Sequence, residues 1–124
     1  MKLRVAVIDD ERPALDELCE YLSACEGIQS LEAYLNPVEA LEAVKLSQPD
    51  VVFLDIYMPQ LTGLGFAKEL LKFCPDTDTV FVTAYKKYAA EAFEANASDY
   101  LLKPINPLTL QKTVEKLFSK RNPA

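Results

Sequence analysis

Short apolar runs alternate with helical patterns along the whole chain, and this alternation limits the fold more than any other feature. Five runs are rich in apolar and β-branched residues, at positions 3–8, 28–35, 51–54, 80–82 and 100–102. After each run, apolar residues recur at helical spacing, as Leu15, Leu18, Cys19 and Leu22 do. Five strands that alternate with five helices predict a single α/β domain, with a parallel sheet covered by helices on both faces.

Asparagine followed by proline marks the start of two of the predicted helices. Asn36-Pro37 and Asn106-Pro107 each combine a preferred N-cap residue with a proline at the first helical position. At 124 residues the chain has the length of one domain. We expect that domain to cover residues 1–119, with the polar residues 120–124 as a frayed tail or the start of a linker.

Composition excludes several classes of function. The chain has no histidine, which rules out Ser-His-Asp and Cys-His catalysis and a histidine-ligated zinc site. The formal net charge of −6 argues against nucleic acid or an anionic membrane surface as a partner of this domain. Three cysteines without a CxxC spacing predict free thiols in a reducing compartment, and no apolar run is long enough to span a membrane. These features predict a cytoplasmic protein.

Polar residues that can take part in binding or catalysis follow four of the predicted strands. Asp9-Asp10-Glu11 follow the first strand, Asp55 the third, Thr83 the fourth and Lys103 the fifth. Ligands of parallel sheets bind at the carboxyl ends of the strands. If the first and third strands are neighbours, their carboxylates repel one another, and a cation would resolve the repulsion. Oxygen ligands without histidine or cysteine favour Mg²⁺, or Mn²⁺ as the alternative, and the nearby hydroxyl and ammonium predict a phosphoryl site.

Each of these residues also has an ordinary structural interpretation. The acidic cluster after the first strand could complement a helix dipole, and Asp55 could cap the following turn. Gly63-Leu64-Gly65 lacks the third glycine of a dinucleotide fingerprint, so we interpret Gly63 as a turn residue at a position with positive φ. The functional hypothesis therefore depends on all of these carboxylate, hydroxyl and ammonium groups lying together at one edge of the sheet.

Four motifs, in this order and spacing, resemble those of response regulator receiver domains of the CheY-like superfamily. They are Val7–Glu11, Phe53–Pro59 with Gly63, Val82–Ala84 and Asp99–Pro104. The resemblance covers the whole chain and implies a flavodoxin-like fold with strand order 2-1-3-4-5. The segment from Thr83 to Pro104 more narrowly resembles receivers attached to LytTR-type DNA-binding domains.

The resemblance implies roles for the acidic residues. Asp55 would be the phosphoacceptor. Asp10 and Asp55 would bind Mg²⁺ directly, with the backbone carbonyl of Tyr57 as a third protein ligand. Asp9 would hold the metal through water.

The resemblance also implies how the domain switches. Thr83 would donate a hydrogen bond to the phosphoryl group, and Lys103 would form an ion pair with the same group. The Lys103-Pro104 peptide bond would be cis. Tyr100 would be the switch residue, outward before phosphorylation and inward afterwards. Tyr57 and Tyr85 occupy positions that tune how fast the phosphoryl group is lost.

In function, the resemblance predicts a two-component signalling domain phosphorylated by a sensor histidine kinase, and not an enzyme acting on an external substrate. Homodimerisation on phosphorylation, and a DNA-binding output domain in a longer chain, are open alternatives to a monomeric stand-alone receiver. Two rival functions fit the sequence less well. Phosphatases of the haloacid-dehalogenase type require a second aspartate two residues after the nucleophile, where this chain has Tyr57. A pseudo-receiver that is never phosphorylated is disfavoured by the complete acidic set.

Overall fold

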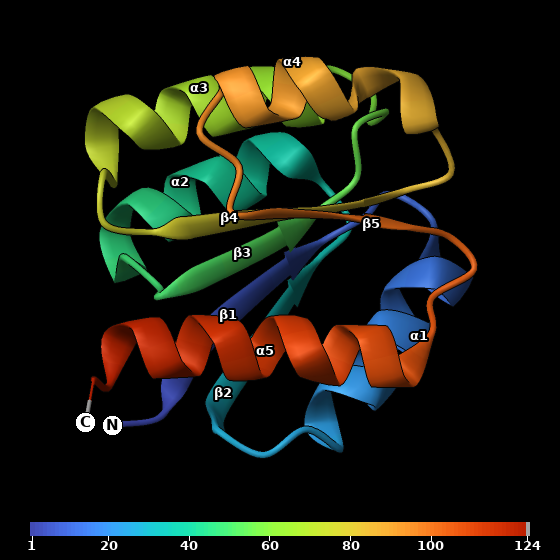
Figure 1. The fold of residues 1–124 in the computed structure, drawn as a ribbon. Coiled ribbons are helices and arrows are strands. Elements are labelled where there is room, and N and C mark those ends of the chain that lie inside the picture. Colours follow the sequence, from blue (N-terminus) through green and yellow to red (C-terminus); the bar gives the residue numbers. More distant parts are fainter. Residues whose placement is uncertain (124) are drawn as a thin grey trace.

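The computed structural model describes residues 1–123 and has a five-stranded parallel sheet in the order β2-β1-β3-β4-β5 (Figure 1). This confirms the predicted fold class and strand order. The strands are β1 (Leu3–Ile8), β2 (Ile28–Tyr34), β3 (Val51–Leu54), β4 (Asp78–Thr83) and β5 (Asp99–Leu102). The helices are α1 (Arg12–Ser23), α2 (Pro37–Ser47), α3 (Gly63–Phe73), α4 (Ala89–Glu94) and α5 (Pro107–Arg121), and a 3-10 turn, η1 (Lys86–Tyr88), precedes α4.

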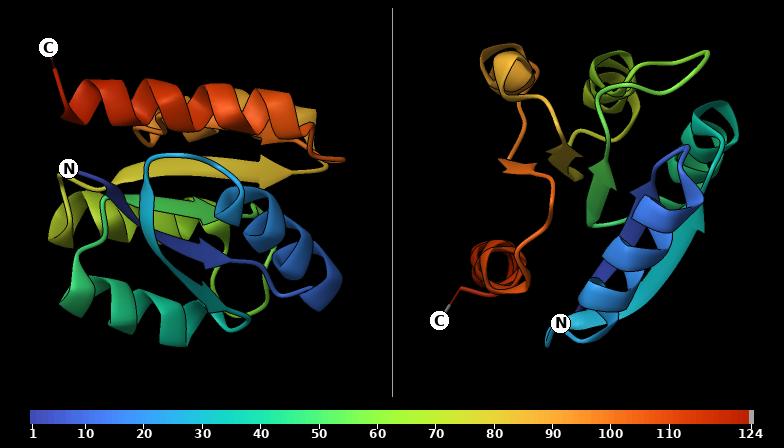
Figure 2. Two further views of the ribbon diagram at one scale, coloured as in Figure 1. Left: turned by 90° about the horizontal axis from the view of Figure 1, so that it is seen from below. Right: turned by 90° about the vertical axis from the view of Figure 1, so that its right-hand side faces the viewer.

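The helices cover both faces of the sheet. Figures 1 and 2 show α2, α3 and α4 on one face and α1 and α5 on the other. Each face has its own apolar core: Phe66 and Phe81 belong to the first, and Phe53 and Leu110 to the second. Every residue of β3 and β4 is buried, as the continuous apolar runs predict for strands covered on both sides.

The two Asn-Pro pairs begin helices as predicted. The Asn36 side chain accepts hydrogen bonds from the backbone N–H groups of Val38 at 2.9 Å and Glu39 at 3.0 Å. Asn106 does the same at α5, with the Leu108 N–H at 2.8 Å. These bonds satisfy N–H groups that have no partner within the helix.

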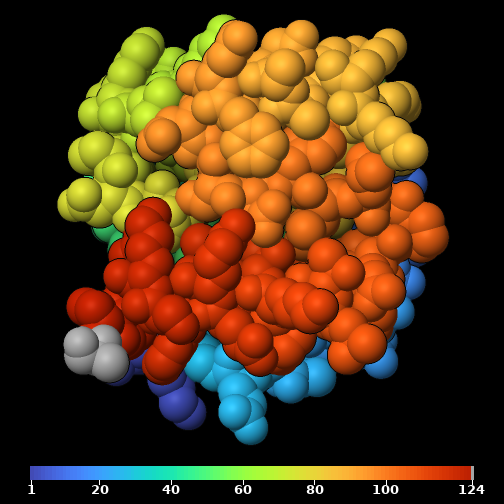
Figure 3. Space-filling model, viewed as in Figure 1, coloured from blue at the N-terminus to red at the C-terminus, as the bar shows by residue number. Residues whose placement is uncertain are grey.

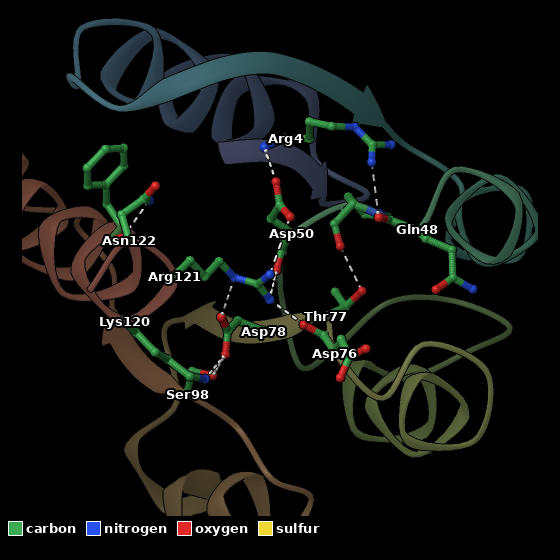
Figure 4. A network of polar contacts seen from close by, with 12 residues as sticks. Arg4, Gln48, Asp50, Asp76, Thr77, Asp78, Ser98, Lys120, Arg121 and Asn122 are labelled. Atoms are coloured by element: carbon green, nitrogen blue, oxygen red, sulfur yellow. Dashed lines mark hydrogen bonds and ion pairs between the residues drawn. The ribbon is translucent and has the colours of Figure 1, made fainter. Parts of the chain in front are cut away.

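Lys120 and Arg121 differ from the expected frayed tail at residues 120–124, of which residue 124 lies outside the described residues. Helix α5 continues to Arg121, and Lys120 Nζ lies 2.6 Å from Oδ1 of the buried Asp78 (Figure 4). Arg121 Nε lies 3.1 Å from Asp78 Oδ2, and its Nη1 lies 3.3 Å from Asp50 Oδ1. Ion pairs to the amino ends of β3 and β4 therefore hold the last turn of α5 against the sheet.

Helices α4 and α5 and strand β5 together form one face of the molecule (Figure 3). Within residues 1–123, no helix combines the length and apolar character needed to cross a membrane.

Candidate functional site

Four of the predicted site residues lie at the carboxyl edge of the sheet, on four adjacent strands. Asp9 directly follows β1, Asp55 directly follows β3, Thr83 is the last residue of β4 and Lys103 directly follows β5. Backbone hydrogen bonds tie these strand ends together, because the N–H of Asp55 donates to the carbonyl of Ile8 and that of Lys103 to the carbonyl of Thr83. The predicted convergence is therefore present in the structure.

Lys103 bridges the two buried carboxylates of the site. Its Nζ lies 2.8 Å from Asp9 Oδ2 and 2.8 Å from Asp55 Oδ2. Burial lowers the pKa of Lys103, but hydrogen bonds and charge attraction from Asp55 and Asp9 outweigh that effect and raise the pKa above its ordinary value. The lysine is therefore a fixed cation beside the side chain of Asp55.

The remaining oxygens of the two carboxylates accept backbone hydrogen bonds. Asp55 Oδ1 accepts from the N–H of Ile56 at 2.6 Å, and Asp9 Oδ1 accepts from the N–H of Glu11 at 3.0 Å. Bonds of this kind fix the orientation of a carboxylate. One side-chain oxygen of Asp55 thus contacts Lys103, and the other accepts a hydrogen bond from the backbone of the next residue.

Gly63 is required by close packing at Asp55. A Cβ at Gly63 would lie 2.0 Å from the backbone carbonyl oxygen of Asp55, which no side chain can adopt without movement of the backbone. The prediction of a positive φ at Gly63 is wrong: among residues 1–123, Gly27 is the only glycine with positive φ. The glycine allows the start of α3 to pack directly against the loop that carries the acceptor carboxylate.

The hydroxyl of Thr83 is buried without a hydrogen-bond partner. Thr83 is 0% exposed, and its Oγ1 is the only such buried side-chain oxygen or nitrogen within the described part of the chain. An unpaired buried hydroxyl costs about 1–3 kcal/mol. A hydroxyl in this state, at the same edge as Asp55, can donate to an oxygen-rich group that enters the site.

The predicted metal ligands are only partly gathered. Asp9 and Asp55 are buried and close to the same lysine, whereas Asp10 is exposed. No cluster of three or more Asp, Glu, Cys or His able to hold a metal ion is present in residues 1–123. The donors are all oxygens, which fits the preference of Mg²⁺, but Asp10 would have to turn toward Asp55 to complete the set.

The three aromatic residues named from the resemblance are Tyr57, Tyr85 and Tyr100, and Tyr85 contacts both of the others. Tyr100, on β5, is half-buried, its ring centroid is 6.2 Å from that of Phe81, and its hydroxyl donates to the backbone carbonyl of Tyr85. The ring of Tyr57 is exposed and packs edge-to-face against Tyr85. The Lys103-Pro104 peptide bond is cis, which confirms the expectation from the resemblance.

Tyr88 is a residue at this edge that the sequence reasoning missed. Its ring packs edge-to-face against Tyr57, and the two hydroxyls contact each other. Tyr88 lies only five positions after Thr83. That proximity, and its place in the segment from Thr83 to Pro104 that resembles LytTR-associated receivers, are the sequence signals that mark it.

A family model for the response regulator receiver domain matches residues 5–115, so the chain belongs to this family. Receiver domains are signalling domains of two-component systems rather than classical enzymes.

Named relatives agree with this assignment. The chain is 47% identical over 117 residues to an uncharacterised response regulatory protein of Yersinia pestis, which covers 93% of this chain and 48% of that protein. It is 40% identical over 124 residues to the transcriptional regulatory protein BtsR of Salmonella typhi, covering 97% of this chain and 50% of BtsR. The response regulatory domain of mrkE from Klebsiella pneumoniae superimposes with a TM-score of 0.89 at 30% identity, over 100% of both chains. The chain therefore spans about half the length of the curated relatives it matches.

Proposed function

We propose that Asp55 accepts a phosphoryl group from a phosphohistidine of a sensor histidine kinase, in a Mg²⁺-dependent reaction, and that the domain then changes conformation to control an output. The observation that carries this proposal is the arrangement of Lys103 between Asp9 and Asp55, at the same edge as the unpartnered hydroxyl of Thr83. A nucleophile, a fixed cation and a free donor are the groups that phosphoryl transfer requires.

In the proposed transfer, an Asp55 carboxylate oxygen attacks phosphorus, and the bond from phosphorus to the donor nitrogen breaks with its electron pair on the imidazole. Asp10, Asp55, the Tyr57 carbonyl and, through water, Asp9 would hold Mg²⁺, which would supply neutralisation of charge on the transferring oxygens. Lys103 pairs with one phosphoryl oxygen in place of its present carboxylate partners.

The proposed switch uses the same residues. The Thr83 hydroxyl and the Lys103 ammonium move toward the new oxygens, because charge-assisted hydrogen bonds are the strongest available to them. Movement of Thr83 opens space beside Phe81, where Tyr100 can turn inward. A change from a mostly inactive to a mostly active population requires about 5.5 kcal/mol of differential binding.

The proposed output is transcription. BtsR is named as a transcriptional regulatory protein and is about twice as long as this chain. We propose that this chain serves a similar regulator of the LytTR-associated kind, with DNA contacted by another domain, since the net charge here is −6. Homodimerisation on phosphorylation is part of the same proposal. The three cysteines are free thiols, which suits the cytoplasm.

Intact mass spectrometry tests the proposal. The chain is incubated with Mg²⁺ and acetyl phosphate, and a gain of one phosphoryl group is expected. Asp55→Asn should abolish the gain, and Asp16→Asn, a change at an exposed carboxylate on α1, should leave it intact. No gain in the unmodified chain, or a gain that survives Asp55→Asn, would contradict the acceptor assignment.

A further inference from the structure

Three tyrosine rings form a cluster at the edge of the sheet that carries Asp55 and Thr83. The ring centroids of Tyr57 and Tyr85 are 4.7 Å apart, those of Tyr57 and Tyr88 5.4 Å, and those of Tyr85 and Tyr88 6.2 Å. All three pairs are edge-to-face, the geometry that aromatic quadrupoles favour. The cluster therefore joins the loop after β3 to the loop after β4.

Tyr88 is the anchored member of the cluster. Its ring is half-buried and packs against the apolar core on the α2–α4 face, whereas Tyr57 is 47% exposed and Tyr85 43% exposed. An exposed side chain changes rotamer within picoseconds to nanoseconds unless another group holds it. Tyr57 is held at its hydroxyl by Tyr88, so the orientation of Tyr57 depends on Tyr88.

The hydroxyls of Tyr57 and Tyr88 are in direct contact. The hydrogen bond with Tyr88, followed by burial and by the charges of Tyr88 and Tyr85, raises the pKa of Tyr57 above its ordinary value. Either hydroxyl can donate to the other, so the contact ties the two side chains together at their tips.

We propose that Tyr88 is a positioning residue: by holding Tyr57 in one orientation within the loop that carries Asp55, it slows the entry of water and so prolongs the phosphorylated state. Tyr57 is two residues after Asp55, in the loop between β3 and α3, and its ring packs against Tyr85 after β4. This inference rests on the proposed phosphorylation of Asp55.

The step that Tyr88 controls is hydrolysis of the acyl phosphate. Water oxygen attacks phosphorus, and the bond from phosphorus to the Asp55 oxygen breaks with its electron pair on the carboxylate. The water proton passes to phosphate and solvent, which leaves free Asp55 and inorganic phosphate. Neither tyrosine gains or loses a proton, because their role is only to exclude water.

The test compares gain and loss of the phosphoryl group by intact mass in Tyr88→Phe and the unmodified chain. After phosphorylation by acetyl phosphate with Mg²⁺, the donor is removed and the decay is followed. We expect decay to accelerate about threefold to tenfold, the effect of losing one hydrogen bond, with the rate of gain unchanged within about twofold. Tyr21→Phe on α1, which removes a hydroxyl far from the cluster, should decay like the unmodified chain.

A double-mutant cycle with Tyr57→Phe identifies the contact as the cause. Each single change should accelerate decay to the same extent, and the double variant should decay no faster than either. A variant that merely destabilised the fold would also gain the phosphoryl group more slowly. Measuring the rate of gain and the rate of decay separately therefore distinguishes a positioning role from general destabilisation.

The outcomes are distinct for the two proposals. No mass gain in the unmodified chain overturns the phosphoacceptor function and this inference with it. A normal gain, with decay of Tyr88→Phe equal to that of the unmodified chain, overturns the inference alone. Additive effects of Tyr57→Phe and Tyr88→Phe would also overturn it.

Discussion

Lys103 and Asp55 form an ion pair that spans β4, the strand that lies between their own two strands. The 2.8 Å contact joins residues 48 positions apart, and a second 2.8 Å contact ties the same ammonium to Asp9. Two buried carboxylates thus share one cation. Removing that cation leaves two negative charges in a poorly hydrated place, with a cost that a bound metal ion could offset.

Lys103→Met should therefore make stability depend more strongly on Mg²⁺. Without divalent cations, we expect the free energy of unfolding to fall by about 1–3 kcal/mol, since both carboxylates lose a partner. Added Mg²⁺ should recover more stability in the variant than in the unmodified chain. Urea denaturation with and without MgCl₂ measures both effects. Lys112→Met, an exposed change on α5, is the control, and equal stability of the two variants without metal would contradict this account.

Gly63→Ala should be disruptive, while Gly65→Ala should not. The new Cβ at position 63 would meet the Asp55 carbonyl at 2.0 Å, so we expect a loss of about 1–3 kcal/mol or more and slower phosphorylation. At position 65 the nearest atoms are side-chain atoms of Leu61 and Thr62 at 3.2 and 3.3 Å. Those side chains can shift, and alanine favours the helix by up to about 1 kcal/mol. Thermal denaturation compares the two, and equal losses would refute the packing argument.

Thr83→Val should separate stability from function. The substitution removes a buried hydroxyl that has no partner in residues 1–123, so stability should stay equal or rise by about 1 kcal/mol. Beryllofluoride with Mg²⁺ should then change the NMR ring signals of Tyr100 in the unmodified chain and much less in the variant. A large loss of stability in Thr83→Val would show that the hydroxyl has a structural partner.

The ion pairs around Asp78, at the amino ends of β3 and β4, should determine how the stability of the fold changes at acidic pH. Burial raises the pKa of Asp78, but hydrogen bonds and charge from Lys120, with further bonds from Ser98 and Arg121, outweigh it and lower the pKa below its ordinary value. A carboxyl with a lowered pKa in the folded state contributes stability above its unfolded pKa, and this contribution is lost as the pH falls through the folded pKa.

Asp78→Asn should therefore be less stable than the unmodified chain at pH 7, and the difference should shrink as the pH falls from about 4 toward 2. Urea denaturation across that range measures the difference. Asp16→Asn at the surface pair with Arg12 should show little effect at any pH. A difference that does not depend on pH would contradict the electrostatic explanation.

The sequence predicted the elements whose causes are local. Continuous apolar runs mark β3 and β4 because both faces of these strands are covered, and Asn36 and Asn106 mark helix starts because their side chains bond the next turn. The gathering of Asp55, Thr83 and Lys103 followed from parallel topology, which puts the strand ends at one edge, together with the strand order that the resemblance implies.

Features that depend on distant contacts were not predictable. Helix α5 extends to Arg121 because of Asp50 and Asp78, which are 71 and 43 residues earlier in the chain. Gly63 is explained by its approach to the carbonyl of Asp55, and no local pattern reveals such a distance. The contact between Tyr57 and Tyr88 joins two loops 31 residues apart and likewise leaves no periodic signal.

The most direct test of the central claim is chemical localisation of the phosphoryl group. Borohydride reduces an aspartyl phosphate to homoserine, so the phosphorylated chain is reduced, digested and sequenced by mass spectrometry. We predict homoserine at position 55 alone, and none without the phosphodonor. Homoserine at Asp9 or Asp10, or a phosphorylated chain with no homoserine at all, would contradict the assignment of Asp55 as the acceptor.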